Sequence, residues 1–406
     1  MSVLPAPVYL NRKSPPHITT LVLMAGTGAL SMNIFLASLP EMANFYGQPY
    51  SIMQFTLTGY LALTGFAQLF IGPISDRIGR RPVMLATIAI FIIASLGAAL
   101  STKFELFMAF RLLQAAVVSG FVISRAAVRD MVSREKAASM LGYVAMGMAL
   151  APMMAPPLGG FLADNFGWQS NFYAMSMIGC ITLTIIFFDQ GETNVHRSRS
   201  FTAQLETYPD LLRSRRFWGY ALMQVFAVGT FFAFLGGAPF VGDKFFDLSA
   251  SQVGLYLSLT PLGYMLGSGI SGRFAGRIGL YRMIVTGALI TLLGMSMTLA
   301  TAGFGVAHPM GFFGFTIFIG LGNGLILPSA NAGMLDVKPA LAGSASGLGG
   351  SLMTFGGASL SALSGFLLTE TSGVYPLIYC ILGAAFLCLL SAIYTIRVEI
   401  EMRGTI

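Results

Sequence analysis

The stretch GPISDRIGRRP at residues 72–82 decides the fold, because a related stretch, GRFAGRIG, stands at residues 272–279. Glycine, arginine, isoleucine and glycine occupy the same relative places in both copies. Each copy also follows one long apolar run and precedes another. A match at the same place in two halves of a chain indicates parallel repeats. We therefore expect two similar bundles of helices, one in each half.

The composition points to a membrane. The 406 residues are 55% hydrophobic and only 10% charged, whereas an average soluble domain is about 25% charged. So few polar side chains cannot cover a soluble surface, and a helix crosses the membrane with about 20 apolar residues. Runs of that length occupy about 18–39, 51–72, 82–101, 104–125, 137–163, 170–188, 217–240, 252–272, 281–302, 310–333, 341–368 and 373–396. The sequence predicts an all-α polytopic membrane protein of twelve transmembrane helices in two six-helix bundles.

The lysines and arginines predict the orientation. Only Lys103 and Lys244 lie in loops on one side, Arg111 lies inside a span, and the other basic residues lie on the side of the two tails. Basic residues collect on the cytoplasmic side of membranes, so both termini are expected there. The expected order is a cytoplasmic tail at 1–17, a bundle at 18–188, a cytoplasmic linker at 189–216, a bundle at 217–396 and a tail at 397–406.

The motif at 72–82 combines glycines with charges at the cytoplasmic face. We expect a loop in which glycines permit a close turn and in which Asp76 caps a helix or pairs with arginines nearby. Such pairs would latch one conformation and release in another. The alternative is a loop that is basic only because it is cytoplasmic. The candidate gating residues are Gly72, Asp76, Arg77, Gly79, Arg80 and Arg81.

Span four carries a charge within the membrane. Arg111 lies about two turns into the span and Gln114 follows it; a charged side chain at such depth usually faces a cavity or a partner. We expect Asn33 of span one and Gln114 to offer it carbonyl oxygens. Snorkelling of Arg111 to the headgroups is the alternative.

Two further spans carry candidate functional residues. Span seven concentrates the aromatic residues Phe231, Phe232 and Phe234, which suit varied apolar ligands unless they face lipid or other helices. Span five contains small residues and prolines, which allow close packing and kinking; packing without any bearing on transport is the alternative there. The candidates in span five are Gly142, Pro156, Gly159 and Gly160.

Several of these motifs resemble known families. The motif at 72–82 and the pattern from Leu106 to Gln114 resemble signatures of the major facilitator superfamily, and span five resembles its drug-antiporter signature. The stretches SRAAVRD at 124–130 and FLGGAPFV at 234–241 are similar to those of the Bcr/CflA family of bicyclomycin-resistance type. This resemblance implies a secondary transporter of the bacterial inner membrane that exports amphipathic drugs or metabolites by alternating access, with protons as the coupling ion and no cofactor.

One departure from that family affects the coupling. The family commonly has aspartate where this chain has Asn33, and none of the 16 acidic residues lies deep in a span. An amide does not carry a proton at physiological pH. Proton antiport therefore rests on the resemblance, and a facilitator or importer of an anionic solute, which Arg111 would attract, remains the alternative.

Other function classes lack a sequence signal. Catalytic and phosphate-binding motifs are absent, and His17, His196 and His308 are unsuited to a shared metal site. An enzyme or a channel is the remaining alternative from another class. We expect no enzymatic activity, no metal, no nucleic-acid partner and a monomer in the lipid bilayer.

Overall fold

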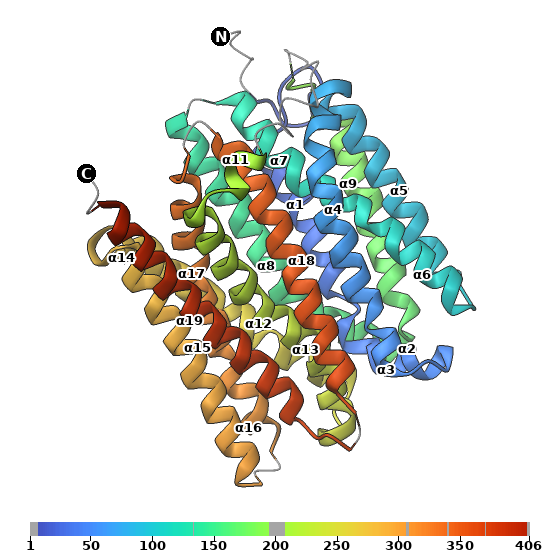
Figure 1. The fold of residues 1–406 in the computed structure, drawn as a ribbon. Coiled ribbons are helices and arrows are strands. Elements are labelled where there is room, and N and C mark those ends of the chain that lie inside the picture. The colour runs from blue at the N-terminus through green and yellow to red at the C-terminus, as the bar shows by residue number, and fades with distance from the viewer. Residues whose placement is uncertain are drawn as a thin grey trace.

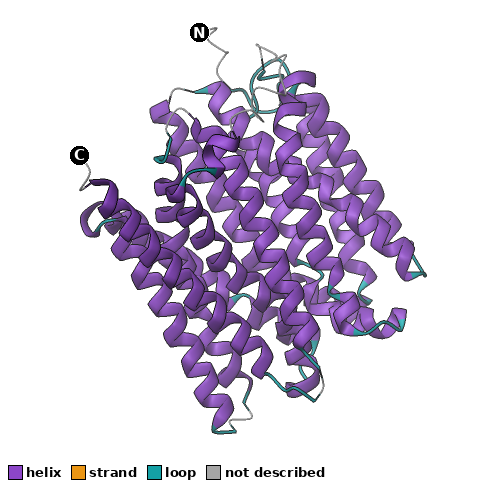
Figure 2. Ribbon diagram, in the orientation of Figure 1, coloured by secondary structure: helices purple, strands orange, loops and turns teal. Residues whose placement is uncertain are grey.

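The computed structural model describes residues 7–132, 134–194, 208–305, 308–338, 341–369 and 371–403. Within these ranges the chain is helical, with connecting loops and without strands (Figure 2). The first half forms α1 (Ile18–Asn33), η1 (Leu36–Ser38), α2 (Leu39–Tyr46), α3 (Tyr50–Met53), α4 (Phe55–Ile78), α5 (Arg80–Leu100), α6 (Phe104–Leu113), η2 (Gln114–Val118), α7 (Ser119–Met131), α8 (Arg134–Phe166) and α9 (Gln169–Asp189).

The second half repeats this order of long helices. It forms α11 (Tyr208–Leu212), α12 (Arg215–Phe246), α13 (Ala250–Leu257), α14 (Leu259–Ile278), α15 (Leu280–Gly303), α16 (Pro309–Phe313), η3 (Gly314–Thr316), α17 (Ile317–Leu335), α18 (Ala342–Leu367) and α19 (Tyr375–Arg403).

Within the described residues these elements make twelve long helical stretches, one for each predicted span. Nine of the stretches in the described ranges are long and apolar enough to cross a membrane. The other three are α8, which contains Pro152, Pro156 and Pro157, the pair α13 and α14, and the glycine- and serine-rich α18. The fold is therefore all-α and polytopic, as predicted.

Several helices continue beyond the predicted spans. α7 runs to Met131 and α8 begins at Arg134, whereas the apolar runs end at 125 and begin at 137. Likewise α19 runs to Arg403, so 397–403, expected as a tail, are helical. Hydropathy reports only the part of a helix that faces lipid, while backbone hydrogen bonding continues into polar sequence.

The helices form two bundles that lie side by side (Figure 1). In the first, α1 packs against α7, α8 and α9, and α5 packs against α9; in the second, α12 packs against α17, α18 and α19. The bundles contact each other through α8 with α13 and through α4 with α18. Both chain ends lie at the same end of the molecule (Figure 1). We call this end the terminal face and the other end the opposite face.

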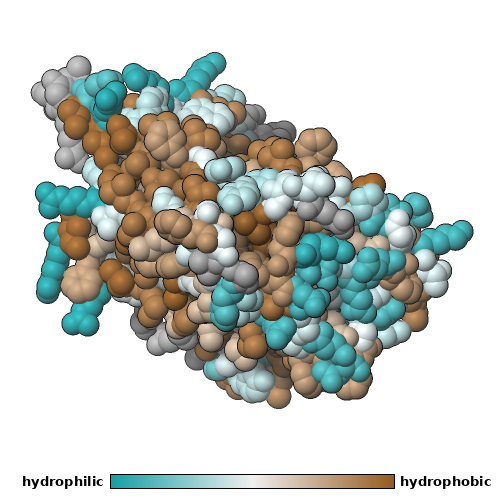
Figure 3. Space-filling view, turned by 90° about the horizontal axis from the view of Figure 1, so that it is seen from below, coloured by the Kyte–Doolittle hydropathy of each residue, from teal (hydrophilic) through white to brown (hydrophobic). Residues whose placement is uncertain are grey.

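The surface of the opposite face is largely hydrophobic, with hydrophilic residues gathered in a few groups (Figure 3).

The motif at 72–82 forms a shorter turn than expected. α4 continues through Pro73 to Ile78, and α5 begins at Arg80, so Gly79 alone reverses the chain, with φ 120°. The predicted loop is therefore wrong in extent, because helical hydrogen bonding persists to the last residue before the turn. Gly279 makes the same one-residue turn between α14 and α15, with φ 92°. Only glycine adopts such positive φ values without strain, which explains why the repeat keeps it in both halves.

Candidate substrate cavity and gates

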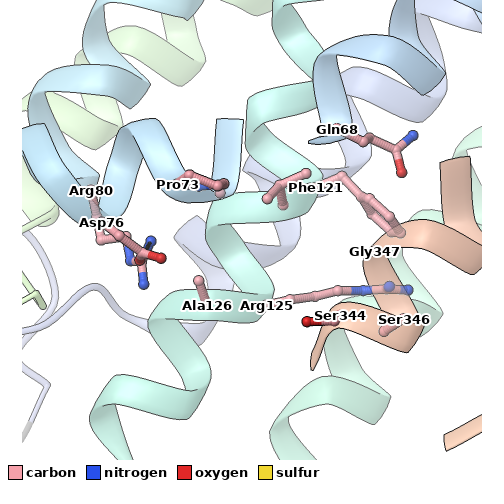
Figure 4. Close-up of a pocket in the computed structure, with 12 residues that line it drawn as sticks. Gln68, Pro73, Asp76, Arg80, Phe121, Arg125, Ala126, Ser344, Ser346 and Gly347 are labelled. Carbon is pink, nitrogen blue, oxygen red and sulfur yellow. Dashed lines mark ion pairs between the residues drawn. The ribbon is translucent and has the colours of Figure 1, made fainter. Parts of the chain in front are cut away.

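A central cavity lies between the two bundles. One hollow of about 380 Å³ is lined by α1, α4 and α7 of the first half and by α12, α14, α17 and α18 of the second. A second, of about 290 Å³, extends along α12 and α17. A third, of about 300 Å³, lies toward the terminal face between Asp76, Arg80 and Ser344 (Figure 4). All three are lined by Phe121 and Arg125.

Contacts between the bundles close the opposite face. The Tyr50 hydroxyl donates to the carbonyl oxygen of Gly236 at 2.8 Å, and Gln54 Nε2 donates to the Ser361 carbonyl oxygen at 2.8 Å. Gln54 and Ser361 are both buried. The cavity in this structure is therefore closed at the opposite face, while its third hollow lies toward the terminal face.

A carboxylate of α8 joins the bundles at the same closed face. Asp164 Oδ1 and Oδ2 accept from the backbone N–H groups of Ala250 and Ser251 at 3.1 and 3.0 Å. Burial would raise the pKa of Asp164, but hydrogen bonds from the side chain and backbone of Ser251, the side chain of Ser249 and the backbone of Ala250 outweigh it and hold that pKa below its usual value. Asp164 thus caps the start of α13 from the other bundle, and the cap favours the ionised carboxylate.

The aromatic candidates of α12 divide into two groups. Phe231 and Phe232 line the cavity. Phe234 is fully buried and packs against Phe313, with ring centroids 6.4 Å apart. Phe234 therefore contributes to the core of the second bundle and does not join the other two.

Arg111 lies one layer behind the cavity wall. Its Nε donates to the Thr56 carbonyl oxygen at 3.1 Å, and its Nη1 donates to Gln114 Oε1 at 2.6 Å. The guanidinium carbon lies 4.2 Å from the ring centroid of Phe35 and 4.1 Å from that of Tyr60. Tyr60 itself lines the cavity. Arg111 is fully buried, so it is held inside the first bundle and does not snorkel.

The expected bond between Asn33 and Arg111 is not formed. Asn33 Nδ2 donates to the Ala29 carbonyl oxygen of its own helix at 2.7 Å. Asn33 Oδ1 and Arg111 Nη2 are both buried without a hydrogen-bond partner. The expectation is wrong: the Nδ2 bond to Ala29 holds the asparagine side chain along its own helix, and its Oδ1 accepts no bond from Arg111.

The candidate gating residues form a charged cluster within the first bundle. Arg80 Nη1 pairs with Asp76 Oδ1 at 2.5 Å, and Arg80 Nε pairs with Asp130 Oδ2 at 3.2 Å (Figure 4 shows the first pair). Burial raises the pKa of Asp130, although Arg80 opposes that shift. The pairs join α4, α5 and α7 of one half. Arg77 is exposed and Gly72 lies within α4.

Residues after α9 complete this cluster. Glu192 accepts from the backbone N–H groups of Arg80 and Arg81 at 2.9 and 3.2 Å, which caps α5. Arg81 Nη2 donates to the Phe187 carbonyl oxygen at 2.8 Å. A side chain at Gly79 would place its Cβ 2.5 Å from Glu192 Oε2. The first part of the predicted linker therefore packs on the first bundle.

The small residues of α8 permit close contact with two neighbours. A Cβ at Gly159 would clash with the Ile34 carbonyl oxygen, and one at Gly160 would clash with that of Ala250. Likewise, a Cβ at Gly254 of α13 would clash with the carbonyl oxygen of Pro156. Gly142 lies in α8, but its surroundings fall outside the described residues.

Arg125 is a cavity residue that the sequence reasoning did not select. It lies at the terminal-face end of span four and lines all three hollows. Arg125 is the last residue of its apolar run, so the rule that selected Arg111, a charge inside an apolar span, did not select it. Sequence alone did not show which of the two arginines reaches the cavity.

Two helical bundles around a central cavity are the arrangement of a membrane transporter. The family model described as the Major Facilitator Superfamily matches residues 21–249 and 243–404. The chain belongs to this superfamily, which confirms the resemblance in the sequence.

The chain is also similar to named relatives. It is 32% identical to an uncharacterized MFS-type transporter of Bacillus subtilis (strain 168), over 87% of this chain and 88% of the relative. It is 29% identical to a chloramphenicol resistance protein of Pseudomonas aeruginosa, over 91% and 88%. It is 25% identical to a bicyclomycin resistance protein homolog of Haemophilus influenzae, over 95% and 98%. Two of these three relatives are named for resistance to a drug.

A solved structure shares the fold. It is a bacterial homolog of the human lysosomal transporter Spinster, with a TM-score of 0.72, 14% identity and coverage of 94% of this chain and 96% of that one.

Proposed function

We propose that the protein exports amphipathic small molecules from the cytoplasm by proton antiport. The observation that carries the proposal is the cavity between the bundles, which combines polar groups such as Gln68 and Arg125 with the rings of Phe231 and Phe232. Such a mixed lining suits an amphipathic ligand. Drug resistance in the names of two relatives supports export.

The terminal face is proposed to be cytoplasmic. The basic residues of the tails and the linker support this orientation, which would make the structure an inward-open state that loads from the cytoplasm. Export would then require release of the contacts that Tyr50, Gln54 and Asp164 make at the opposite face. Because one chain encloses the whole cavity, we propose that the monomer is the transporting unit.

Proton coupling is proposed because the chain resembles a family of proton antiporters; the residues of the cavity give it less support. Asp76 is the one carboxylate among the described residues that line the three hollows, and it is paired with Arg80. Asn33 stands where the resembling family commonly has an acid. An uncoupled facilitator is therefore the alternative, and the transport experiment below distinguishes it from an antiporter.

The test uses proteoliposomes containing the full chain and radiolabelled chloramphenicol. Antiport predicts that an imposed pH gradient drives accumulation against the chloramphenicol gradient, and that an uncoupler abolishes it. Protein-free liposomes give the passive background. Equilibration that never exceeds the external concentration and ignores the pH gradient would establish a facilitator. In intact cells, expression should lower the internal concentration; a rise would indicate an importer.

A further inference from the structure

The side chain of Gln54 crosses from the first bundle into the second at the closed opposite face. Gln54 stands between α3 and α4, and its Nε2 donates to the carbonyl oxygen of Ser361 in α18 at 2.8 Å. The helices α4 and α18 lie side by side (Figure 1). Because a carbonyl oxygen can only accept, the amide nitrogen of Gln54 must face Ser361. The other polar atom of the amide, Oε1, is therefore directed at a different neighbour.

Two glycines of the second bundle make room for this amide. A Cβ at Gly365 of α18 would clash with Gln54 Oε1. A Cβ at Gly236 of α12 would clash with Gln54 Nε2 and with Ser361 Oγ. Small residues permit such close approach between helices. We call the space between Gly236 and Gly365 the glycine notch; a larger residue in either place would block it.

Two polar atoms in the glycine notch lack hydrogen bonds. Among the described residues, neither Gln54 Oε1 nor Ser361 Oγ has a hydrogen-bond partner, although both atoms are buried. Leaving a buried polar atom unbonded costs more free energy than one ordinary hydrogen bond contributes. Separation of the bundles at this face admits water, which can bond both atoms. The contact thus carries a free-energy cost that is present only while the face is closed.

The other two contacts across this face differ, because their polar groups are bonded. The Tyr50 hydroxyl donates to the Gly236 carbonyl oxygen, and both carboxylate oxygens of Asp164 accept backbone N–H groups of α13. These two contacts stabilise the closed face. Gln54 combines one hydrogen bond with an unbonded oxygen, so its net effect on the closed face has the opposite direction.

We propose that Gln54 destabilises the closed opposite face and so keeps it ready to open during transport. An apolar side chain of the same length would keep the packing in the glycine notch and remove the unbonded oxygen, so the closed state would gain stability. The Ser361 carbonyl oxygen would remain bonded, since it also accepts from the Ser364 hydroxyl at 2.8 Å. A methyl group in the notch would instead displace Gln54 and favour the open state. The inference rests on the proposed function, because it takes the structure as one state of a transport cycle.

Distances between spin labels across each face measure this equilibrium. Cysteines at exposed positions carry the labels, at Asn44 and Thr369 for the opposite face and at Ile78 and Ile278 for the terminal face. The native cysteines are replaced. Pulsed electron paramagnetic resonance on the full chain in nanodiscs, without substrate or pH gradient, gives the population of each distance. We expect wild type to show both the closed and the open distance at the opposite face.

Two variants should shift the populations in opposite directions. Gln54→Met should raise the ratio of closed to open opposite face about tenfold, and the terminal face should open to the same extent. Gly365→Ala should lower that ratio, whereas the matched control Gly383→Ala, which has open space around it, should not change it. In a Gln54→Ala background Gly365→Ala should have no effect, because the shortened side chain no longer enters the glycine notch.

The inference is overturned if Gln54→Met lowers the ratio or leaves it unchanged, or if wild type shows only the closed distance. It is also overturned if Gly365→Ala acts equally in the Gln54→Ala background. Failure of the proposed function is a separate result, since chloramphenicol export is measured in cells and these distances are measured without substrate. Export with an unchanged ratio in Gln54→Met would refute this inference alone. The expected shifts without export would refute the proposed function alone.

Discussion

At the scale of the residue, Arg111 links three elements of the first bundle. It holds the backbone of α4 through Thr56, bonds Gln114 and stacks between Phe35 and Tyr60. We expect Arg111→Ala to reduce transport at least tenfold, because hydrogen bonds to a charged group contribute about 1.5–3 kcal/mol each and Tyr60 loses its support at the cavity wall. Initial rates in proteoliposomes, normalised to inserted protein, measure this. Normal rates in Arg111→Ala would show that the residue only fills space.

Asn33 belongs to the same bundle as Arg111, although the two side chains form no hydrogen bond with each other. Its Oδ1 and the Nη2 of Arg111 are both buried and unpartnered, so the first bundle holds a buried donor that a carboxylate could pair with. We expect Asn33→Asp to fold and to make the transport rate more strongly dependent on pH than in wild type. Rate–pH profiles of the two proteins test this, with Asn33→Leu as the apolar control. Superimposable wild-type and Asn33→Asp profiles would place the coupling elsewhere.

At the scale of the element, the turn between α4 and α5 depends on its charged cluster. We expect Asp76→Asn to impair transport several-fold while the protein still reaches the membrane, because the loss of a charged contact shifts a two-state equilibrium by about 1–3 kcal/mol. Transport in reconstituted protein measures the effect. Asp210→Asn is the matched control, since the exposed pair of Asp210 and Lys338 contributes little. Wild-type rates in Asp76→Asn would rule out a gating role for the cluster.

The start of α13 gives a second prediction at this scale. The pKa of Asp164 is held below its usual value. The contacts of the ionised carboxylate with α13 are therefore fully present at any pH above the usual aspartate pKa. They are lost only when the pH falls through the lowered pKa. The closed opposite face should therefore be unchanged between pH 5 and 8, a range above the usual aspartate pKa of about 3.9. Asp164→Asn should loosen it throughout that range.

A cysteine at Ser361, which is buried at this face, reports the change. Its rate of labelling by an impermeant maleimide should rise in Asp164→Asn, in a background lacking Cys180, Cys380 and Cys388. Equal labelling rates at neutral pH with and without the carboxylate would show that Asp164 does not hold the face closed.

At the scale of the whole molecule, the two faces should lie on different sides of the membrane. We expect a cysteine at Ser198 to be labelled by an impermeant maleimide only from the cytoplasm and one at Ala250 only from outside, because the basic residues are distributed so unequally. Intact cells and inside-out vesicles provide the two measurements. Labelling of both positions from the same side would contradict the predicted topology.

The sequence by itself determined the helical class, the order of the spans and the repeat. Those properties follow from local constraints: membrane thickness sets the length of an apolar run, and the positive φ of the turns at Gly79 and Gly279 demands glycine. The pairing of Asp76 with a nearby arginine was also accessible, since both residues stand in the short charged motif at 72–82; that the partner is Arg80, across the chain reversal at Gly79, is a property of the structure.

Tertiary structure alone decided which charge reaches the cavity. Arg111 and Arg125 lie in the same span, and nothing in its sequence distinguishes a covered arginine from an accessible one. Phe35 and Tyr60, from other helices, cover Arg111, whereas Arg125 faces the space between the bundles. Likewise, Phe234 packs against Phe313 while Phe231 lines the cavity. The physical reason is that side-chain burial depends on neighbours brought together by packing between helices, which local sequence does not encode.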